Sequence, residues 1–263
     1  MPLLALDVDG TLMRSDNTLS PRNAAAVAQA RGRGWQVLLA TGKPPWAVAR
    51  LVQRLGLPGP HIVANGCGLW RPAAGLEVLA RIEEPDVRAA LAFGARHGIP
   101  RATSGPRGVF CERDWDAAAV ARALAEVGEE PPSLVADGVA ADADPWKVIL
   151  ILPAGAPHPA PPAVASGRWV RTHPNFLEAL PRQASKGAAL DLLCARLGIA
   201  AAQVVAFGDG ENDLEMLRWA GHGVAMAHAP AAVRAAAAGV TAGNDEDGVA
   251  LELERLLAGG TGP

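Results

Sequence analysis

The sequence has little cysteine and no long apolar run. Its three cysteines, Cys67, Cys111 and Cys194, are far apart and odd in number. This spacing excludes a disulfide framework and a zinc cluster, and it favours buried thiols in a reducing compartment. No apolar run approaches the roughly 20 residues that span a bilayer. The first residues lack a basic start and meet Asp7 at once. We therefore expect no signal peptide, no membrane anchor and a cytoplasmic location.

The sequence also lacks an excess of positive charge. The net charge of −3 gives no broad basic surface, so nucleic acid is not an expected partner. Of the 24 basic residues only Lys43, Lys147 and Lys186 are lysines, so arginine serves wherever any cation suffices. Each lysine is therefore a candidate for a position that requires a compact ammonium group.

What the sequence does contain is a regular alternation of strands and helices at both ends. Apolar runs at 3–6, 35–40, 204–207 and 223–226 are each followed by a turn and a helical stretch, and a further run at 61–64 ends at Asn65-Gly66. This alternation predicts right-handed strand–helix–strand units and a parallel sheet. Between about 69 and 180 the apolar runs are shorter and turn residues more frequent, which predicts an inserted α+β module. Its strands are expected at 76–82, 109–111, 147–152 and 169–171, and its helices at 86–97 and 116–127.

The predicted fold class is therefore α/β, with a Rossmann-like parallel sheet core and an inserted α+β cap domain. The expected boundaries are 1–81 and 182–263 for the core and 82–181 for the cap. With 263 residues, half of them hydrophobic, the chain is long enough for two modest domains. We expect a monomer or a homodimer.

The first strand leads directly into Asp7 and Asp9 and then Gly10. Residues two apart in an extended segment point the same way, so both carboxylates are expected together at the strand's carboxyl end, where ligands bind in open α/β sheets. Two adjacent carboxylates repel unless a proton or a cation lies between them, and Mg²⁺ prefers oxygen ligands. Taken alone, the motif is equally typical of a surface turn.

Polar residues follow three further strands, and one lysine begins a helix. Because the carboxyl ends of parallel strands meet at one edge of the sheet, these groups are expected to share a site. Carboxylates favour a divalent cation, whereas threonine, lysine and helix N-termini favour a phosphate. Together they indicate phosphoryl transfer. The residues are Thr41-Gly42-Lys43, Asn65-Gly66, Ser185-Lys186 and Gly208-Asp209-Gly210-Glu211-Asn212-Asp213.

In this order and spacing, the motifs resemble the haloacid dehalogenase superfamily, and more narrowly its Cof-type phosphatases, in which an α/β cap is inserted mid-chain. The resemblance covers nearly the whole chain. The four family motifs correspond to Asp7-Val8-Asp9-Gly10-Thr11-Leu12, Thr41-Gly42, Ser185-Lys186-Gly187 and the run 208–213, and Asn65-Gly66 and Asn244-Asp245-Glu246-Asp247-Gly248-Val249 match two further stretches.

The resemblance implies a role for each acidic residue. Asp7 would be the nucleophile that forms an aspartyl-phosphate. Asp9 would protonate the leaving alkoxide and then activate water. Mg²⁺ would be bound by the Asp7 carboxylate, the Asp9 backbone carbonyl and Asp209, with Asp213 beside its outer ligands or a bound water.

The remaining motif residues would contact the substrate. Thr41, Gly42 and Lys186 would hold the transferring phosphoryl group, and Asn212 the phosphate or the nucleophile. A substrate contact is also expected for Asn65, whereas a loop-shaping role is expected for Asn244. Two positions depart from the subgroup. Lys43 stands where arginine is frequent, which leaves its role open, and a structural role is expected for His228, which replaces asparagine.

The predicted function is that of a Mg²⁺-dependent phosphatase acting on a small phosphorylated metabolite such as a sugar phosphate. A phosphomutase or phosphotransferase with the same nucleophile is the first alternative, and a non-enzymatic phospho-acceptor module is the second. The cap would select the leaving group. Its candidate specificity residues, each expected at the surface, are Arg101, Arg107, Arg113, Lys147, His173 and Asn175.

Overall fold

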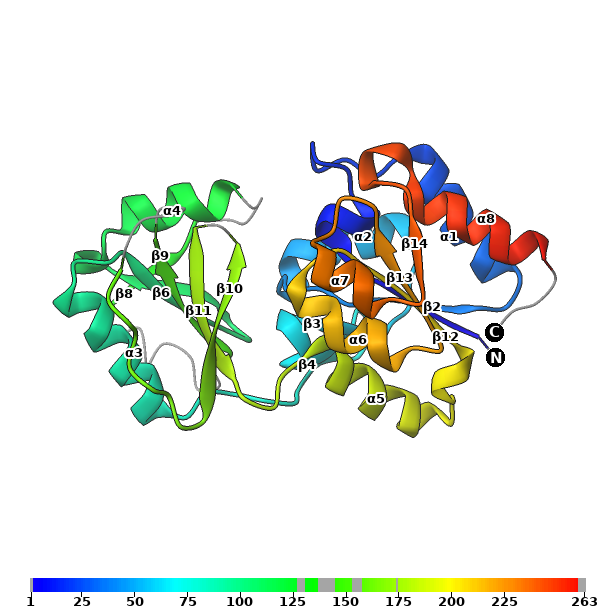
Figure 1. Cartoon of the computed structure of the whole chain (residues 1–263). Coiled ribbons are helices and arrows are strands. Elements are labelled where there is room, and N and C mark those ends of the chain that lie inside the picture. Colours follow the sequence, from blue (N-terminus) through cyan, green and yellow to red (C-terminus); the bar gives the residue numbers. More distant parts are fainter. Residues whose placement is uncertain (1, 127–130, 137–144, 153–157, 174, 260–263) are drawn as a thin grey trace. The chain divides into compact units, whose positions relative to one another are not determined.

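The structure, a computed structural model, describes residues 2–126, 131–136, 145–152, 158–173 and 175–259. The chain divides into two compact units (Figure 1): Met1–Glu77 with Ser185–Pro263, called here the core unit, and Val78–Ala184, called the inserted unit. The boundaries expected from the sequence, 82 and 181, both fall within the inserted unit. Among the described residues, no helix is both long and apolar enough to cross a membrane.

The core unit is built on a parallel sheet of five strands in the order β14-β13-β12-β1-β2. The expected parallel core and its inserted cap are thereby confirmed. The strands are β1 (Leu3–Leu6), β2 (Gln36–Leu39), β12 (Val204–Gly208), β13 (His222–Met226) and β14 (Gly239–Thr241). The first strand lies in the middle of the sheet, and all four of its residues are buried. Such continuous apolar runs are typical of parallel strands that are covered on both faces.

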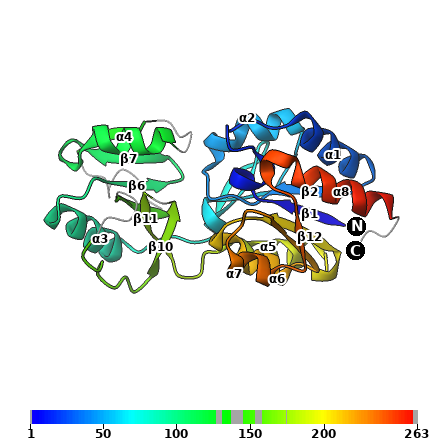
Figure 2. The ribbon, with the colours of Figure 1, turned by 45° about the horizontal axis from the view of Figure 1, so that its top comes forward.

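Two groups of helices provide that cover. Figure 2 shows α1, α2 and α8 on one side of the sheet and α5, α6 and α7 on the other. The helices are α1 (Pro21–Gly32), α2 (Pro45–Leu55), α5 (Lys186–Leu197), α6 (Leu214–Trp219), α7 (Ala231–Ala236) and α8 (Gly248–Ala258). Serine residues cap two of these helices: the hydroxyl groups of Ser20 and Ser185 accept hydrogen bonds from the amides of Asn23 and Ala188.

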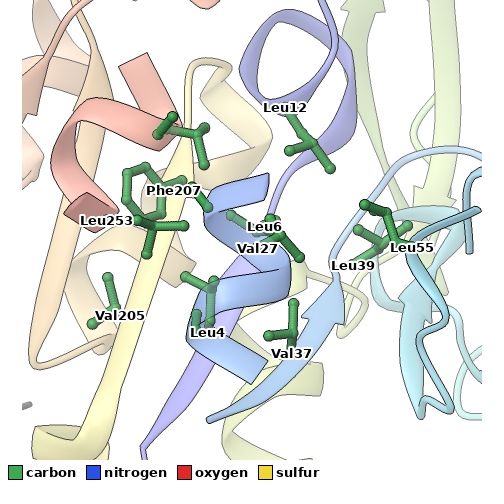
Figure 3. Close-up of a cluster of buried hydrophobic side chains, with 14 of the residues drawn as sticks. Leu4, Leu6, Leu12, Val27, Val37, Leu39, Leu55, Val205, Phe207 and Leu253 are labelled. Atoms are coloured by element: carbon green, nitrogen blue, oxygen red, sulfur yellow. The ribbon is translucent and has the colours of Figure 1, made fainter. Parts of the chain in front are cut away.

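The hydrophobic core on one face of this sheet combines residues from both ends of the chain. Leu4 and Leu6 of β1 pack beside Phe207 of β12, and Val27 of α1 and Leu253 of α8 cover them (Figure 3). Burial of each large apolar side chain stabilises the fold by about 1.5–3 kcal/mol. The first strand is therefore fixed on both sides by segments from opposite ends of the chain.

A small sheet of three strands, in the order β3-β4-β5, follows α2. The strands are β3 (His61–Val63), β4 (Gly68–Arg71) and β5 (Gly75–Val78). The sequence predicted β3 but not β4, and it placed β5 too late, at 76–82. A parallel bridge between Ala40 and Ile62 joins this small sheet to the end of β2.

The inserted unit contains a mixed sheet of six strands in the order β10-β11-β9-β6-β7-β8, with two helices. Its elements are α3 (Glu84–Arg96), β6 (Arg101–Gly105), β7 (Gly108–Glu112), α4 (Ala117–Glu126), β8 (Ser133–Val135), β9 (Lys147–Ile151), β10 (Gly167–His173) and β11 (Phe176–Pro181). Both helices and three of these strands were predicted, whereas β6, β8 and β11 were missed. The short helical turns of the two units are Val8–Leu12, Ala64–Gly66, Arg113–Trp115, Ala201–Gln203, Glu211–Asp213 and Asn244–Glu246.

Two of the cap residues expected at the surface are buried. Lys147, at the start of β9, is 6% exposed, and its ammonium nitrogen lies 2.7 Å from Oε1 of Glu178 on β11, which is 1% exposed. Arg101, at the start of β6, is 7% exposed. The expectation of surface positions is wrong for both, because β6 and β9 are the two central strands of the six-stranded sheet and have a neighbouring strand on each side. The side chains of Arg113 and His173 lie outside the described residues.

The buried ion pair gives a prediction about stability. Changing Lys147 to Met leaves Glu178 buried without its cation, which costs about 3–5 kcal/mol. The double variant Lys147→Met with Glu178→Leu removes both charges, so it should recover most of this loss. Urea unfolding of the full chain, followed by tryptophan fluorescence, measures both changes. Equal stability of the single and double variants would show that the unpaired carboxylate is not the cause.

Candidate active site

The site is organised around the ammonium group of Lys186, the first residue of α5. Its Nζ lies 2.6 Å from Oδ1 of Asp7 and 2.7 Å from Oδ1 of Asp213, and its side chain is 1% exposed. Asp7 follows β1 directly, and Asp213 lies in the turn after β12. Burial disfavours the charge on Lys186, but the two carboxylates outweigh it and raise its pKa above the ordinary value.

The second oxygen of Asp213 holds the loop after β12. Its Oδ2 accepts hydrogen bonds from the amides of Asp209 and Gly210, at 3.0 and 2.9 Å. Both carboxylate oxygens of Asp213 are therefore used, one by Lys186 and one by the backbone. Asp209 is fixed from another direction, because the hydroxyl of Thr11 donates to its Oδ1 at 2.9 Å.

Three carboxylates converge in this site. One oxygen from each of Asp7, Asp209 and Asp213 lies within 4.8 Å of the others, a grouping that could hold a metal ion. A single ammonium balances only one of three ionised carboxylates, so the cluster has an excess of negative charge. Burial raises the pKa of Asp7 to about 7 and that of Asp213 to about 6, against the opposing effect of Lys186. Burial also raises the pKa of Asp209. A divalent cation with oxygen ligands fits such a cluster.

Asp9 lies outside this cluster. Its side chain is 45% exposed, and Oδ1 lies 2.9 Å from Nζ of Lys43. The strand ends at Leu6, and the chain turns over Val8–Leu12. The alternation that predicted a common direction for the two carboxylates therefore does not continue to Asp9. At Gly10 the backbone has φ +76°, and a Cβ would lie 2.5 Å from Oδ2 of Asp209, so only glycine fits this turn.

A second set of polar residues surrounds the turn after β2. Thr41 is fully buried, and its Oγ1 accepts a hydrogen bond from the amide of Lys43 at 3.0 Å. Its carbonyl accepts from the amide of Asn65, also at 3.0 Å. Asn65 Oδ1 in turn accepts from Nδ2 of Asn212 at 2.9 Å. A Cβ at Gly42 would lie 3.1 Å from Oδ1 of Asn65, so the two turns lie directly against each other.

His228 lies on the outer side of the acidic cluster. Its Nε2 is 3.6 Å from Oδ2 of Asp209, and its side chain is 41% exposed. Both residues line a hollow of about 810 Å³ in the core unit. Asn244 lines the same hollow, but its Nδ2 donates to the carbonyl of Met13 at 3.0 Å, which holds the loop after β1. The position of His228 beside Asp209 was not anticipated.

Sequence reasoning gave no role to three other residues of the site. Thr11 belongs to the first motif, and it is the hydroxyl that holds Asp209. The hydroxyl of Ser185 donates to the Glu215 carboxylate, in addition to capping α5. Lys43 had no assigned role, although the scarcity of lysine singled it out. The position of Thr11 within the first motif is the sequence feature that could have indicated a role for it in the site.

Comparison with known proteins agrees with the fold and with the motifs. The family model of the haloacid dehalogenase-like hydrolases matches residues 4–253. A crystal structure of a haloacid dehalogenase-like hydrolase from Bacteroides thetaiotaomicron superposes with a TM-score of 0.84 at 25% identity, over 97% of this chain and 99% of that one.

Two curated relatives differ in length. A Bacillus subtilis protein named 5-amino-6-(5-phospho-D-ribitylamino)uracil phosphatase YitU is 26% identical over 97% of this chain and 97% of its own length. An Arabidopsis thaliana protein named chloroplastic endoribonuclease YBEY is 31% identical over 95% of this chain. The chain spans only 45% of that relative.

The matched residues run from β1 to α8 and so include the inserted sheet, which confirms the expectation of a mid-chain cap of the Cof type. The order of the motifs, the parallel core and the family match over most of the chain all agree. The chain belongs to the haloacid dehalogenase-like hydrolases.

Proposed function

We propose that this hydrolase is a Mg²⁺-dependent phosphatase that acts on a small phosphorylated metabolite, such as a sugar phosphate, through an aspartyl-phosphate intermediate. The observation that carries the proposal is the buried Asp7 carboxylate, held by Lys186 beside Asp209 and Asp213. A carboxylate fixed in this way can attack phosphorus, and the surrounding charges can neutralise the phosphoryl oxygens. The name of the Bacillus subtilis relative YitU, a phosphatase of a phosphorylated small molecule, supports the substrate class.

In the first step, an oxygen of Asp7 attacks phosphorus and the bond to the leaving alkoxide breaks. Asp9 donates a proton to that alkoxide. Its side chain lies outside the acidic cluster, beside Lys43, where solvent reaches it. In the second step, Asp9 takes a proton from water as the water attacks phosphorus, which releases phosphate and restores the Asp7 carboxylate.

Other residues hold the reacting groups. Lys186 fixes the nucleophile and, with Thr41, Gly42 and Asn212, would contact the phosphoryl oxygens. The hydrogen bond between Asn65 and Asn212 keeps that amide in place. Asp7, the Asp9 backbone carbonyl and Asp209 would hold Mg²⁺, with Asp213 alongside. When bound, Mg²⁺ offsets the repulsion between the anionic nucleophile and the anionic phosphate.

The chemistry alone also allows transfer to a second substrate, as in a phosphomutase. The exposure of Asp9 favours hydrolysis, because a solvated carboxylate has water beside it to activate. The same feature disfavours a long-lived phospho-acceptor. Our proposal also includes a cytoplasmic location and a monomer or homodimer. The three free, buried thiols of Cys67, Cys111 and Cys194 support a reducing compartment.

Replacing the two aspartates separately tests the mechanism. Asp7→Asn should reduce turnover to background, because no other residue takes over the attack. Asp9→Asn should lower kcat by roughly 10²–10⁴-fold, the usual contribution of a general acid–base group. It should also accumulate phospho-enzyme, which intact-mass spectrometry after acid quenching detects. A screen of phosphorylated metabolites supplies the substrate for these assays. Turnover by Asp7→Asn would disprove this mechanism.

Metal binding should depend on pH. The fold raises the pKa of Asp7 from 3.8 to about 7. Between these two pH values the folded chain keeps a proton that the unfolded chain loses, so the stability of the fold decreases as the pH rises. Mg²⁺ needs the ionised form, so its addition should raise Tm more at pH 8 than at pH 5. Thermal melts with Mg²⁺ and with a chelator measure this.

Two variants control the metal experiment. Asp209→Asn should lose the Mg²⁺-dependent rise in Tm, whereas Asp245→Asn should keep it. Asp245 lines the neighbouring hollow but is not part of the acidic cluster. A rise that is the same at both pH values, or that survives Asp209→Asn, would contradict the assignment.

The ion pair between Lys43 and Asp9 predicts a positioning role for Lys43. Lys43→Met should lower kcat about tenfold with a smaller change in KM, because Asp9 loses the group that orients it. Lys43→Arg should restore part of the rate. Arg50→Met removes an equal charge from the exposed face of α2 and should leave the rate unchanged. If all three variants behave alike, the ion pair has no role in turnover.

A further inference from the structure

Arg101 is a buried cation to which the proposed mechanism gives no role. It is 7% exposed at the start of β6. Its Nη1 donates one long hydrogen bond, 3.3 Å, to the carbonyl of Ile99, and its Nε has no hydrogen-bond partner. Within the part of the chain that the structure describes, no carboxylate forms an ion pair with it. A buried charge in this condition is costly unless a partner of opposite charge is supplied.

The surrounding residues make room for this side chain. A Cβ on Gly94, in the interior of α3, would lie 2.6 Å from Cδ of Arg101. Glycine in a helix interior costs about 1 kcal/mol relative to alanine, and here it leaves space for the arginine stem. The ring of Trp115 lies on the other side, with its centroid 5.0 Å from Cζ of Arg101. The guanidinium is thus held in place while its Nε remains unsatisfied.

Two cavities within the inserted unit border this guanidinium. Their volumes are about 400 Å³ and 210 Å³, and both are lined by Arg101, Trp115 and Ala95. The larger has the size of a small-ligand site. Leu91 and Ala92 give it an apolar wall, and Arg88, Glu112 and Ala136 complete the lining. The larger cavity is therefore lined by two cations and one carboxylate, whereas the smaller is also lined by Asp114 and Asp116, so only the larger suits an anion, and one of low charge.

We propose that this place is a binding site for a small oxyanion, a ligand with one carboxylate or phosphate group and an apolar part. The terminal nitrogens of the planar guanidinium donate to the oxygens of such a group, a type of contact that arginine favours. The apolar part packs on Trp115 and Leu91. The site lies wholly within the inserted unit and is separate from the acidic cluster around Lys186.

Fluorine NMR of the full chain tests the site, with 5-fluorotryptophan in place of its seven tryptophans. The Trp115→Phe variant identifies the Trp115 resonance, which reports locally and so is not affected by phosphate bound at the proposed active site. Inorganic phosphate and butyrate, which has one carboxylate and a short apolar chain, are titrated separately against sodium chloride of equal ionic strength. We expect one or both anions to shift the Trp115 resonance saturably, and the pair of titrations distinguishes a phosphate site from a carboxylate site.

Three variants decide the interpretation. Arg101→Met should abolish the shift, and Arg96→Met, which removes an exposed charge from the nearby helix α3, should retain it. Gly94→Ala keeps the charge but displaces the arginine stem, so it should weaken binding at least tenfold and serves if Arg101→Met does not fold. The proposal is overturned if neither anion shifts the resonance below about 50 mM, the millimolar range of the weakest specific binding. It is also overturned if the shift persists unchanged in the Arg101 or Gly94 variant.

Discussion

The arrangement of the site depends on one buried ammonium group that two carboxylates share. Lys186 could not remain charged in this position without Asp7 and Asp213, and neither carboxylate could remain ionised there without Lys186. The three residues come from the end of β1, the start of α5 and the turn after β12. Their mutual dependence joins three elements that are far apart in the sequence. Asp7, the proposed nucleophile, is thus held in position before any substrate arrives.

Three buried cations of this chain have different surroundings. In the core unit one cation is shared by two acids, and in the inserted unit Lys147 has a single partner, Glu178. Arg101 lies over the Trp115 ring, and Asp114 and Glu112 are near enough to favour its charge, but among the described residues no carboxylate forms an ion pair with it. The acidic cluster around Lys186 lies in the core unit and Arg101 lies in the inserted unit, so the two proposed sites are separate.

Sequence patterns predicted the core unit far better than the inserted unit. Continuous apolar runs such as Leu3–Leu6 have few interpretations, and motif residues at their ends must lie at one edge of a parallel sheet. The strand β6 consists of small and polar residues, and β11 contains Glu178 and ends at Pro181, so neither shows the usual strand pattern. The pairing of Lys43 with Asp9 was equally unpredictable, because it depends on the direction that the turn over Val8–Leu12 gives to the Asp9 side chain.

The three lysines that drew attention in the sequence are all withdrawn from solvent. Lys186 is enclosed, Lys147 is buried in the inserted sheet, and the side chain of Lys43 is only 16% exposed. The folded chain thus offers almost no lysine amine to reagents that acylate amines. Covalent labelling at Lys147 or Lys186 would report local opening of the inserted unit and of the core unit respectively, one natural probe in each. A composition poor in one residue type has given this protein its own reporters of unfolding.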